Sequence, residues 1–398
     1  MKRNKDLILF IVFVLLFMAC SVEKENKEKT AEKLNMEFPL RILLDTNNDT
    51  YNYNNVRLNP KSIYIDDSLV YLSINKNIYA LNFSNKDEPS LKLKISKDKN
   101  NEFFNSNVPH FIKADNNGNI YVENIRIVEE EVKTEDKNKK VSKLKKTEHH
   151  ILKYDYLGEF LYRLGPSGRN DDNDFDTNNN IEEMYVNADG NLSLIIKTYI
   201  NLENVSYEEE EELDSPVFDK SNIDFSKYKF VKYNPEGKII YTLDISNIKE
   251  LNKSSDKYIR VIENVKLNPS GDKIFISTKD YVKKQVSDSD DYYINIENFS
   301  VYVYDLSINK LKEKPIKIEY DRYYMLGVDI NNHIYLASPE NKDELRFIVY
   351  DINGNIKENK KIIINNVRQK RYEFFFNKEG YIANAFIEND KIRIIQYK

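Results

Sequence analysis

The sequence predicts an all-β protein: a β-propeller of six four-stranded blades, closed by a strand from near the N-terminus. Two observations carry this prediction. Seven of the ten glycines fall in short polar turns between apolar segments. Those segments are short, alternate in polarity or are densely apolar, and are rich in β-branched and aromatic residues, as strands are. No sustained helical periodicity follows residue 37.

The turns share one pattern, in which an Asp or Asn is followed by polar residues and a glycine. Glycine, or Asn in its place, supplies the positive φ that a hairpin reversal needs, and the preceding Asp or Asn hydrogen-bonds the turn backbone. Glycine turns lie at residues 115–119, 155–158, 187–191, 234–237, 268–271, 351–355 and 377–380, and turns without glycine lie at 66–68 and 329–332.

The turns group into repeated units of two hairpins. The units span about 62–95, 111–164, 181–245, 261–318 and 324–364, and a last segment, 372–398, has only about three strands. A repeated four-stranded unit is the mark of a β-propeller. Residues 38–44, just after the charged N-terminal stretch, are expected to supply the missing strand and close the ring. Five or seven blades remain alternatives because insertions blur the spacing.

Two stretches resemble the consensus of NHL-type six-bladed propellers. The residues that carry the resemblance are Phe103 or Phe104, Pro109, Ile112, Asp115, Gly118, Asn119, Ile120, Tyr121 and Val122 in one stretch, and residues 164–168, Phe175, Ile181 and 189–191 in the other. The similarity covers most of residues 60–380 but is strong in only two or three blades. Long insertions and the lack of a repeated Arg on the third strand depart from the family. The absence of tryptophan separates the chain from WD-type and quinoprotein-like propellers.

The N-terminus resembles a bacterial lipoprotein signal of the relaxed, spirochaete type. Basic residues precede an uncharged apolar run, residues 7–18, which is too short to span a bilayer. The run ends at Ala19 and Cys20, and Cys20 is the only cysteine in the chain. The resemblance implies that the signal peptide is cleaved before Cys20. Cys20 then becomes the first residue and carries the acyl chains. Phe17 stands where the family usually has an aliphatic residue, and an ordinary cleaved signal is the competing interpretation.

These features divide the chain into three parts. Residues 1–19 are expected to be the signal peptide, 20–37 a flexible charged tether after the lipidated Cys20, and 38–398 a single propeller domain. A short amphipathic helix is the alternative for the tether. The mature chain is acidic, so the lipid anchor, rather than attraction to anionic lipids, would hold it at the membrane.

Composition excludes several classes of function. Sixty basic residues against 65 acidic ones give a net charge of -5, which argues against a nucleic-acid partner. One cysteine excludes a disulfide framework, and four histidines leave little room for a histidine metal centre. No nucleophile elbow, phosphate loop or dinucleotide fingerprint is present. We therefore expect neither enzymatic activity nor a cofactor.

Two groups of acidic residues are candidate sites. Asp172, Asp174, Asp176 and Glu183 have the spacing of a calcium-binding EF-hand loop, although Thr177 stands where that loop needs glycine. Three insertions, at 129–148, 203–222 and 283–298, fall between the second and third strands of their blades, so they should emerge on one face. The candidate partner-binding residues in them are Glu208, Glu209, Glu210, Glu211, Glu212, Asp288, Asp290 and Asp291. Solvated loops without a partner are the competing interpretation.

The favoured function is a lipid-anchored, non-enzymatic scaffold for protein–protein interactions in the cell envelope. Propeller lipoproteins of similar architecture serve in outer-membrane β-barrel assembly, so the resemblance implies an accessory subunit of that machinery at the outer membrane, facing the periplasm. Two alternatives remain open. One is a surface-exposed lipoprotein that binds a host ligand, and the other is a small-molecule binder or enzyme that uses the central channel.

Overall fold

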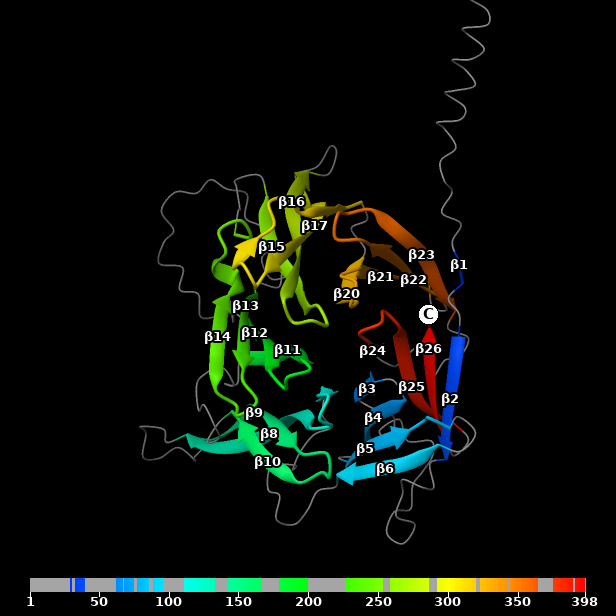
Figure 1. The fold of residues 1–398 in the computed structure, drawn as a ribbon. Coiled ribbons are helices and arrows are strands. Elements are labelled where there is room, and N and C mark those ends of the chain that lie inside the picture. Colours follow the sequence, from blue (N-terminus) through cyan, green and yellow to red (C-terminus); the bar gives the residue numbers. More distant parts are fainter. Residues whose placement is uncertain are drawn as a thin grey trace, which may run out of the picture.

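The protein, described here by a computed structural model, is a ring of six antiparallel sheets around a central axis (Figure 1). The first strand of each repeat lies nearest the axis, and the later strands of the repeat follow outward. This arrangement confirms the predicted six-bladed, four-stranded β-propeller. The structure describes residues 29–30, 33–39, 62–66, 68–74, 77–85, 89–95, 111–132, 142–165, 179–199, 226–252, 258–285, 292–319, 323–341, 344–363, 375–388 and 391–397.

The first three blades are each an up-and-down sheet of four consecutive strands. Blade 1 consists of β3 (Ser62–Asp66), β4 (Leu69–Ile74), β5 (Asn77–Asn82) and β6 (Ser90–Ile95). Blade 2 consists of β7 (Ile112–Ala114), β8 (Ile120–Val132), β9 (Ser142–Tyr154) and β10 (Phe160–Leu164). Blade 3 consists of β11 (Asn179–Val186), β12 (Leu192–Tyr199), β13 (Ser226–Tyr233) and β14 (Ile239–Asp244), followed by the 3₁₀ turn η6 (Ile245–Asn247).

The last three blades carry the additions to this plan. Blade 4 consists of β15 (Ile259–Leu267), β16 (Lys273–Gln285), β17 (Tyr292–Asp305) and two short strands on β17, β18 (Lys310–Leu311) and β19 (Ile316–Ile318). Blade 5 consists of β20 (Tyr324–Val328), β21 (Ile334–Asn341), β22 (Glu344–Tyr350) and β23 (Ile356–Ile363). Blade 6 has β24 (Phe375–Phe376), β25 (Ile382–Glu388) and β26 (Lys391–Tyr397).

Blade 6 takes its outermost strand from the other end of the chain. Strand β2 (Lys33–Pro39) pairs antiparallel with β26, from Lys33 opposite Tyr397 to Pro39 opposite Lys391. The closing strand was predicted at residues 38–44 but lies at 33–39, because Met36 and Phe38, two residues apart, pack against the core between blades 6 and 1.

The N-terminal segment is also ordered further upstream than predicted. A two-residue strand, β1 (Lys29–Thr30), pairs in parallel with β23 of blade 5. The prediction of a flexible tether over residues 20–37 is therefore wrong for the residues in β1 and β2. High charge density concealed the strands, because the charged residues alternate with apolar ones only over β2.

Six separate apolar cores hold the ring together, one between each pair of neighbouring blades. Successive residues of one strand contribute to different cores. In β12, Leu194 and Ile196 belong to the core shared with blade 2, whereas Ile195 belongs to the core shared with blade 4. Burial on both sides explains why the inner strands read as continuous apolar runs rather than strict alternations.

The Asp/Asn-Gly turns have the geometry expected from the sequence. Asp115 Oδ1 accepts hydrogen bonds from the backbone N–H groups of Asn117 and Asn119, both at 2.9 Å. Gly118 closes the turn with a φ of +78°, and Asn332 takes the same place in blade 5 with a φ of +63°. The same pair of side-chain bonds recurs at Asp155, Asp329, Asp351 and Asn377.

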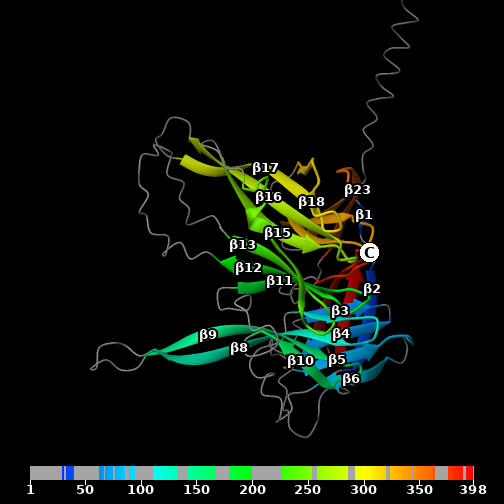
Figure 2. The ribbon, with the colours of Figure 1, turned by 60° about the vertical axis from the view of Figure 1, so that its left-hand side comes forward.

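The two faces of the ring differ in character. One, here called the turn face, carries the turns between first and second and between third and fourth strands. The other, the hairpin face, carries the connections between second and third strands. In Figure 2 the long hairpins β8–β9 and β16–β17 project to the same side. The predicted insertions in blades 2 and 4 are thus partly strand rather than loop.

The closing strand should contribute a large share of the stability. Phe38 is fully buried and its ring meets that of Phe83 edge-on, with the ring centroids 6.3 Å apart. We expect Phe38→Ala to lower the free energy of unfolding by about 3–5 kcal/mol, measured by chemical denaturation. The neighbouring Glu37→Ala removes only half-exposed ion pairs to Lys391 and Arg393 and should cost less than about 1 kcal/mol. Equal effects of the two changes would show that β2 is not part of the cooperative unit.

Candidate functional site

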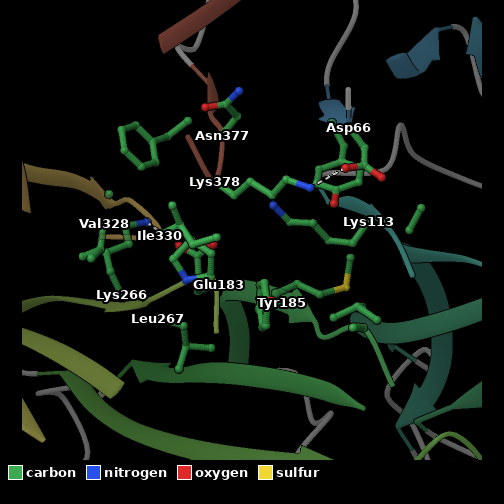
Figure 3. Close-up of a pocket in the computed structure, with 18 of the residues that line it drawn as sticks. Asp66, Lys113, Glu183, Tyr185, Lys266, Leu267, Val328, Ile330, Asn377 and Lys378 are labelled. Atoms are coloured by element: carbon green, nitrogen blue, oxygen red, sulfur yellow. Dashed lines mark hydrogen bonds and ion pairs between the residues drawn. The ribbon is translucent and has the colours of Figure 1, made fainter. Parts of the chain in front are cut away.

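A cavity of about 250 Å³ lies on the axis of the propeller, and all six blades contribute to its lining (Figure 3). In blades 1 to 5 the lining includes the residue two positions before the Asp or Asn of the first turn. These residues are Tyr64, Lys113, Tyr185, Lys266 and Gly327. Blade 6 contributes Phe376 and Lys378.

Strand alternation explains why this position faces the axis. The residue that follows it on each first strand packs mainly into a core between blades, although Ala114, Val186, Leu267 and Val328 also border the cavity. The residue before it therefore points most directly at the axis. Those buried residues are Ile65, Ala114, Val186, Leu267 and Val328, and each belongs to a different core. The turn therefore fixes the register that aims one side chain per blade at the axis.

Two ion pairs cross between blades inside the cavity. Lys266 Nζ of blade 4 lies 2.9 Å from Glu183 Oε2 of blade 3. Lys378 Nζ of blade 6 lies 2.6 Å from Asp66 Oδ1 of blade 1. Burial alone would lower the pKa of Lys266, but the charge and hydrogen bond of Glu183 together raise it above the ordinary lysine value. Lys266 is therefore held in its charged form.

Lys113 differs from these two lysines. Its ammonium nitrogen lies over the Tyr64 ring, 5.0 Å from the ring centroid. No carboxylate among the described residues lies within ion-pair distance of it. Burial lowers the pKa of Lys113; Glu183 opposes this shift and the neighbouring positive charge of Lys266 adds to it. Among the described residues, Lys113 is thus the cavity lysine without an ion-pair partner: the Tyr64 ring lies against its ammonium, and Glu183 acts on it only from beyond ion-pair distance.

Apolar side chains form part of the cavity wall. In Figure 3, Val328 lies on the far side of the cavity from Lys113 and Asp66, next to Lys266, and Ile330 lies beside Lys378. Leu267 of blade 4 and Leu326 of blade 5 extend this wall. Gly327 leaves no side chain on the inner strand, and Phe376 of blade 6 packs against it. The cavity lining therefore combines charged side chains, including two ion pairs, with apolar ones.

The two tyrosines of the lining act as neutral groups. Burial raises the pKa of Tyr185 to about 12, with a smaller contribution from the charge of Asp272. Burial also raises the pKa of Tyr64 far above its ordinary value. Both phenols keep their protons at physiological pH, so they offer hydrogen bonds and aromatic faces rather than negative charge.

Most of the site residues predicted from sequence lie outside the described part of the chain. This holds for Cys20, for Asp172, Asp174 and Asp176, for Glu208 to Glu212, and for Asp288, Asp290 and Asp291. Glu183, the fourth residue of the predicted calcium set, lies on the inner strand of blade 3, where Lys266 binds its carboxylate. Among the described residues, no group of three or more His, Cys, Asp or Glu could hold a metal ion.

Sequence reasoning did not find the charged lining. The signal was present, since the turn motif marks the inward position two residues earlier, but it becomes readable only once the register of each blade is known. In the five blades this position holds two lysines, two tyrosines and a glycine. These residue types differ too much in charge and size to be recognised as one site from the sequence. Within the part of the chain that the structure covers, no helix is long and apolar enough to cross a membrane.

Comparison with known proteins identifies no family. No protein-family model matches the chain, and no curated protein matches it. Similar solved structures include a luciferin-regenerating enzyme, with 11% identity, coverage of 92% of this chain and 95% of that chain, and a TM-score of 0.43. A member of the DUF4221 family from Bacteroides vulgatus has 12% identity, coverage of 94% and 99%, and a TM-score of 0.41.

An acylaminoacyl peptidase from Pyrococcus horikoshii is also similar, with 11% identity and a TM-score of 0.37, over 83% of this chain and 43% of that chain. At these identities and TM-scores the similarity assigns no activity to this chain. The resemblance to NHL-type propellers likewise extends no further than the six-bladed fold.

The ammonium of Lys113, which has no ion-pair partner among the described residues, should lower the stability of the fold. An unfolded chain keeps this proton up to about pH 10.4, whereas the folded state releases it at lower pH. Unfolding therefore takes up a proton between the two pKa values, and stability rises with pH in that window. We expect Lys113→Met to stabilise the protein at neutral pH by about 1 kcal/mol and to remove this rise.

Chemical denaturation at several pH values measures both effects. Lys266→Met is the matched control, because it leaves the carboxylate of Glu183 without its partner and should destabilise the fold. If both lysine variants lost stability equally at neutral pH, Lys113 would have a compensating partner in the folded chain.

Proposed function

We propose that the protein is a lipid-anchored scaffold of the cell envelope that binds a protein partner through the hairpin face of blades 2 to 4. The propeller fold is consistent with an interaction scaffold. The observation that carries the proposal is the asymmetry of the hairpin face. In blades 1, 5 and 6 only two residues separate the second strand from the third, as between Ile74 and Asn77.

The three consecutive blades between them are built differently. In blades 2 and 4 the hairpin strands are 13 or 14 residues long, and in blade 3 the chain between β12 and β13 covers residues 200–225. Ordering strand residues that extend past the neighbouring blades costs conformational entropy, and these residues add no contacts to the cores between blades. Such extra length on a single sector of a rigid ring supports a role in binding.

Charge indicates the character of the partner. The stretch 203–222 in the connection of blade 3 holds eight acidic residues and one basic residue. These include Glu208 to Glu212, the residues predicted as a docking run. A partner with a basic surface would complement this sector, and charge of this kind increases the rate of association more than the final affinity.

The direction of the first strands supports the placement of the anchor. Strand β2 begins at Lys33, opposite Tyr397, and Tyr397 also pairs with Ile382, which follows the first turn of blade 6. The chain therefore enters blade 6 at the turn face. Nine residue steps separate Cys20 from Lys29, a reach of at most about 30 Å. A lipid on Cys20 would thus hold the turn face near the membrane and leave the hairpin face exposed.

Shortening one hairpin tests the proposed docking face. Replacing residues 127–147 by Asn-Gly keeps the pair Arg126 and Glu148 next to the new turn and leaves the inner part of blade 2 intact. We expect an envelope protein to co-purify with the full-length chain from gently solubilised membranes and to be lost from the shortened variant. Quantitative mass spectrometry of the purified material measures the loss.

Leu157→Glu serves as the matched control, because Leu157 is 59% exposed on the turn face and should leave the partner bound. Retention of the partner by the shortened variant would move the docking face away from blade 2. If no envelope protein co-purified with the unaltered chain, the role in outer-membrane barrel assembly would be abandoned in favour of a host ligand.

The anchor has its own test. We expect Cys20→Ala to abolish incorporation of labelled palmitate and to shift the protein from the detergent phase to the aqueous phase on phase separation. Protease added to intact cells then distinguishes the two sides of the outer membrane. Protection of residues 38–398 supports a periplasmic scaffold, whereas cleavage within them supports a surface lipoprotein.

A further inference from the structure

We propose that the axial cavity binds a small organic monocarboxylate. The carboxylate would pair with the ammonium of Lys113, and the apolar body of the molecule would lie against the apolar residues of the lining, among them Leu267, Val328 and Ile330. This site is independent of the hairpin face, because it lies at the centre of the ring. Failure of either proposal leaves the other standing.

The charges of the cavity define the charge of the ligand. Three lysines and two carboxylates line the cavity, and both carboxylates are bound by a lysine of another blade. The remaining cation, Lys113, is held in place by the Tyr64 ring, which keeps it in the cavity without neutralising it. One negative charge supplied by a ligand would therefore complete the pairing.

The shape of the cavity favours an organic anion over an inorganic one. Sites for phosphate usually combine several donors, such as arginine side chains or a series of backbone N–H groups. Here one ammonium, that of Lys113, has no ion-pair partner among the described residues and shares a cavity of about 250 Å³ with several aliphatic side chains. Small-molecule sites commonly have this combination of a mostly apolar lining and a few placed polar groups.

The cavity reaches the turn face of the ring. Its lining includes the turn residues Asn116, Ala188, Pro269 and Ile330 of four different blades. The backbone N–H of Ile330 donates to the carbonyl of Lys378 at 2.8 Å, which ties the turns of blades 5 and 6 together at this rim. The turns of blades 5 and 6 are thus held together at this end of the cavity.

Fluorine NMR of the full-length chain in detergent tests the proposal. The probes are para-fluorophenylacetate, its neutral amide para-fluorophenylacetamide, and inorganic phosphate as a competitor. We expect the acid to bind at least about tenfold more tightly than the amide, and phosphate to compete weakly. Empty micelles provide the reference for partition of the probes into detergent.

Substitutions at Lys113 assign the effect to this cavity. Lys113→Met should reduce binding of the acid to that of the amide, and Lys113→Arg should restore the preference for the acid. Lys238→Met, on an exposed turn of blade 3, should leave both affinities unchanged. Circular dichroism shows that each variant is folded.

Three results would overturn the proposal: equal binding of acid and amide by the unaltered chain, undiminished binding of the acid by Lys113→Met, or the absence of saturable binding of the acid. Strong competition by phosphate at the Lys113 site would replace the organic carboxylate by an inorganic anion.

Discussion

The ring depends on one noncovalent seam between the two ends of the chain. Blades 1 to 5 each contain four strands of their own repeat, but blade 6 has three and borrows β2. The core between blades 6 and 1 contains Phe38 of β2 together with residues of both blades. Because each core is shared by two neighbours, loss of β2 would uncover the edge of β26 and part of the adjoining core at once. The segment nearest the expected lipid anchor is thus also the one that completes the fold.

The turn face is similar from blade to blade, whereas the hairpin face varies. Most of the Asp or Asn turns share a backbone hydrogen bond from the N–H of the turn's fourth residue to the carbonyl of its Asp or Asn, and they lie next to the inner strands whose register they help to fix. Contacts between neighbouring turns reinforce this register, as where the hydroxyl of Tyr121 in blade 2 donates to the carbonyl of Gly190 in blade 3 at 3.0 Å. The hairpin face is free of this constraint, so its connections range from two residues to long hairpins. A rigid cavity and a variable docking face can therefore coexist on one ring.

Sequence alone was sufficient for the architecture and insufficient for the site. The turn residues, such as Asp115 and Gly118, act locally, so their spacing predicts the blades. The start of the closing strand depends on contacts with blades more than 300 residues away, and charged neighbours hid it. The cavity depends on side chains of six blades meeting at one axis, and no local pattern links Lys113 to Glu183 or Asp66. Such convergence becomes visible only when the ring is closed.

The geometry of the turn face makes the two proposals compatible, although neither depends on the other. The chain enters blade 6 at Lys33 on the turn face, so a lipid on Cys20 would lie on the same side of the ring as the mouth of the axial cavity. Molecules with an anionic group and an apolar body concentrate at the surface of a bilayer, because their apolar part gains by leaving water. In an anchored propeller the mouth of the cavity, with Lys113 and the apolar lining residues behind it, would lie toward the bilayer surface where such molecules concentrate. The long hairpins would point to the other side of the ring, toward soluble or membrane-bound partners. The charge of Lys113 has no ion-pair partner among the described residues and so costs stability, and a function in binding an anion gives a physical reason for its presence.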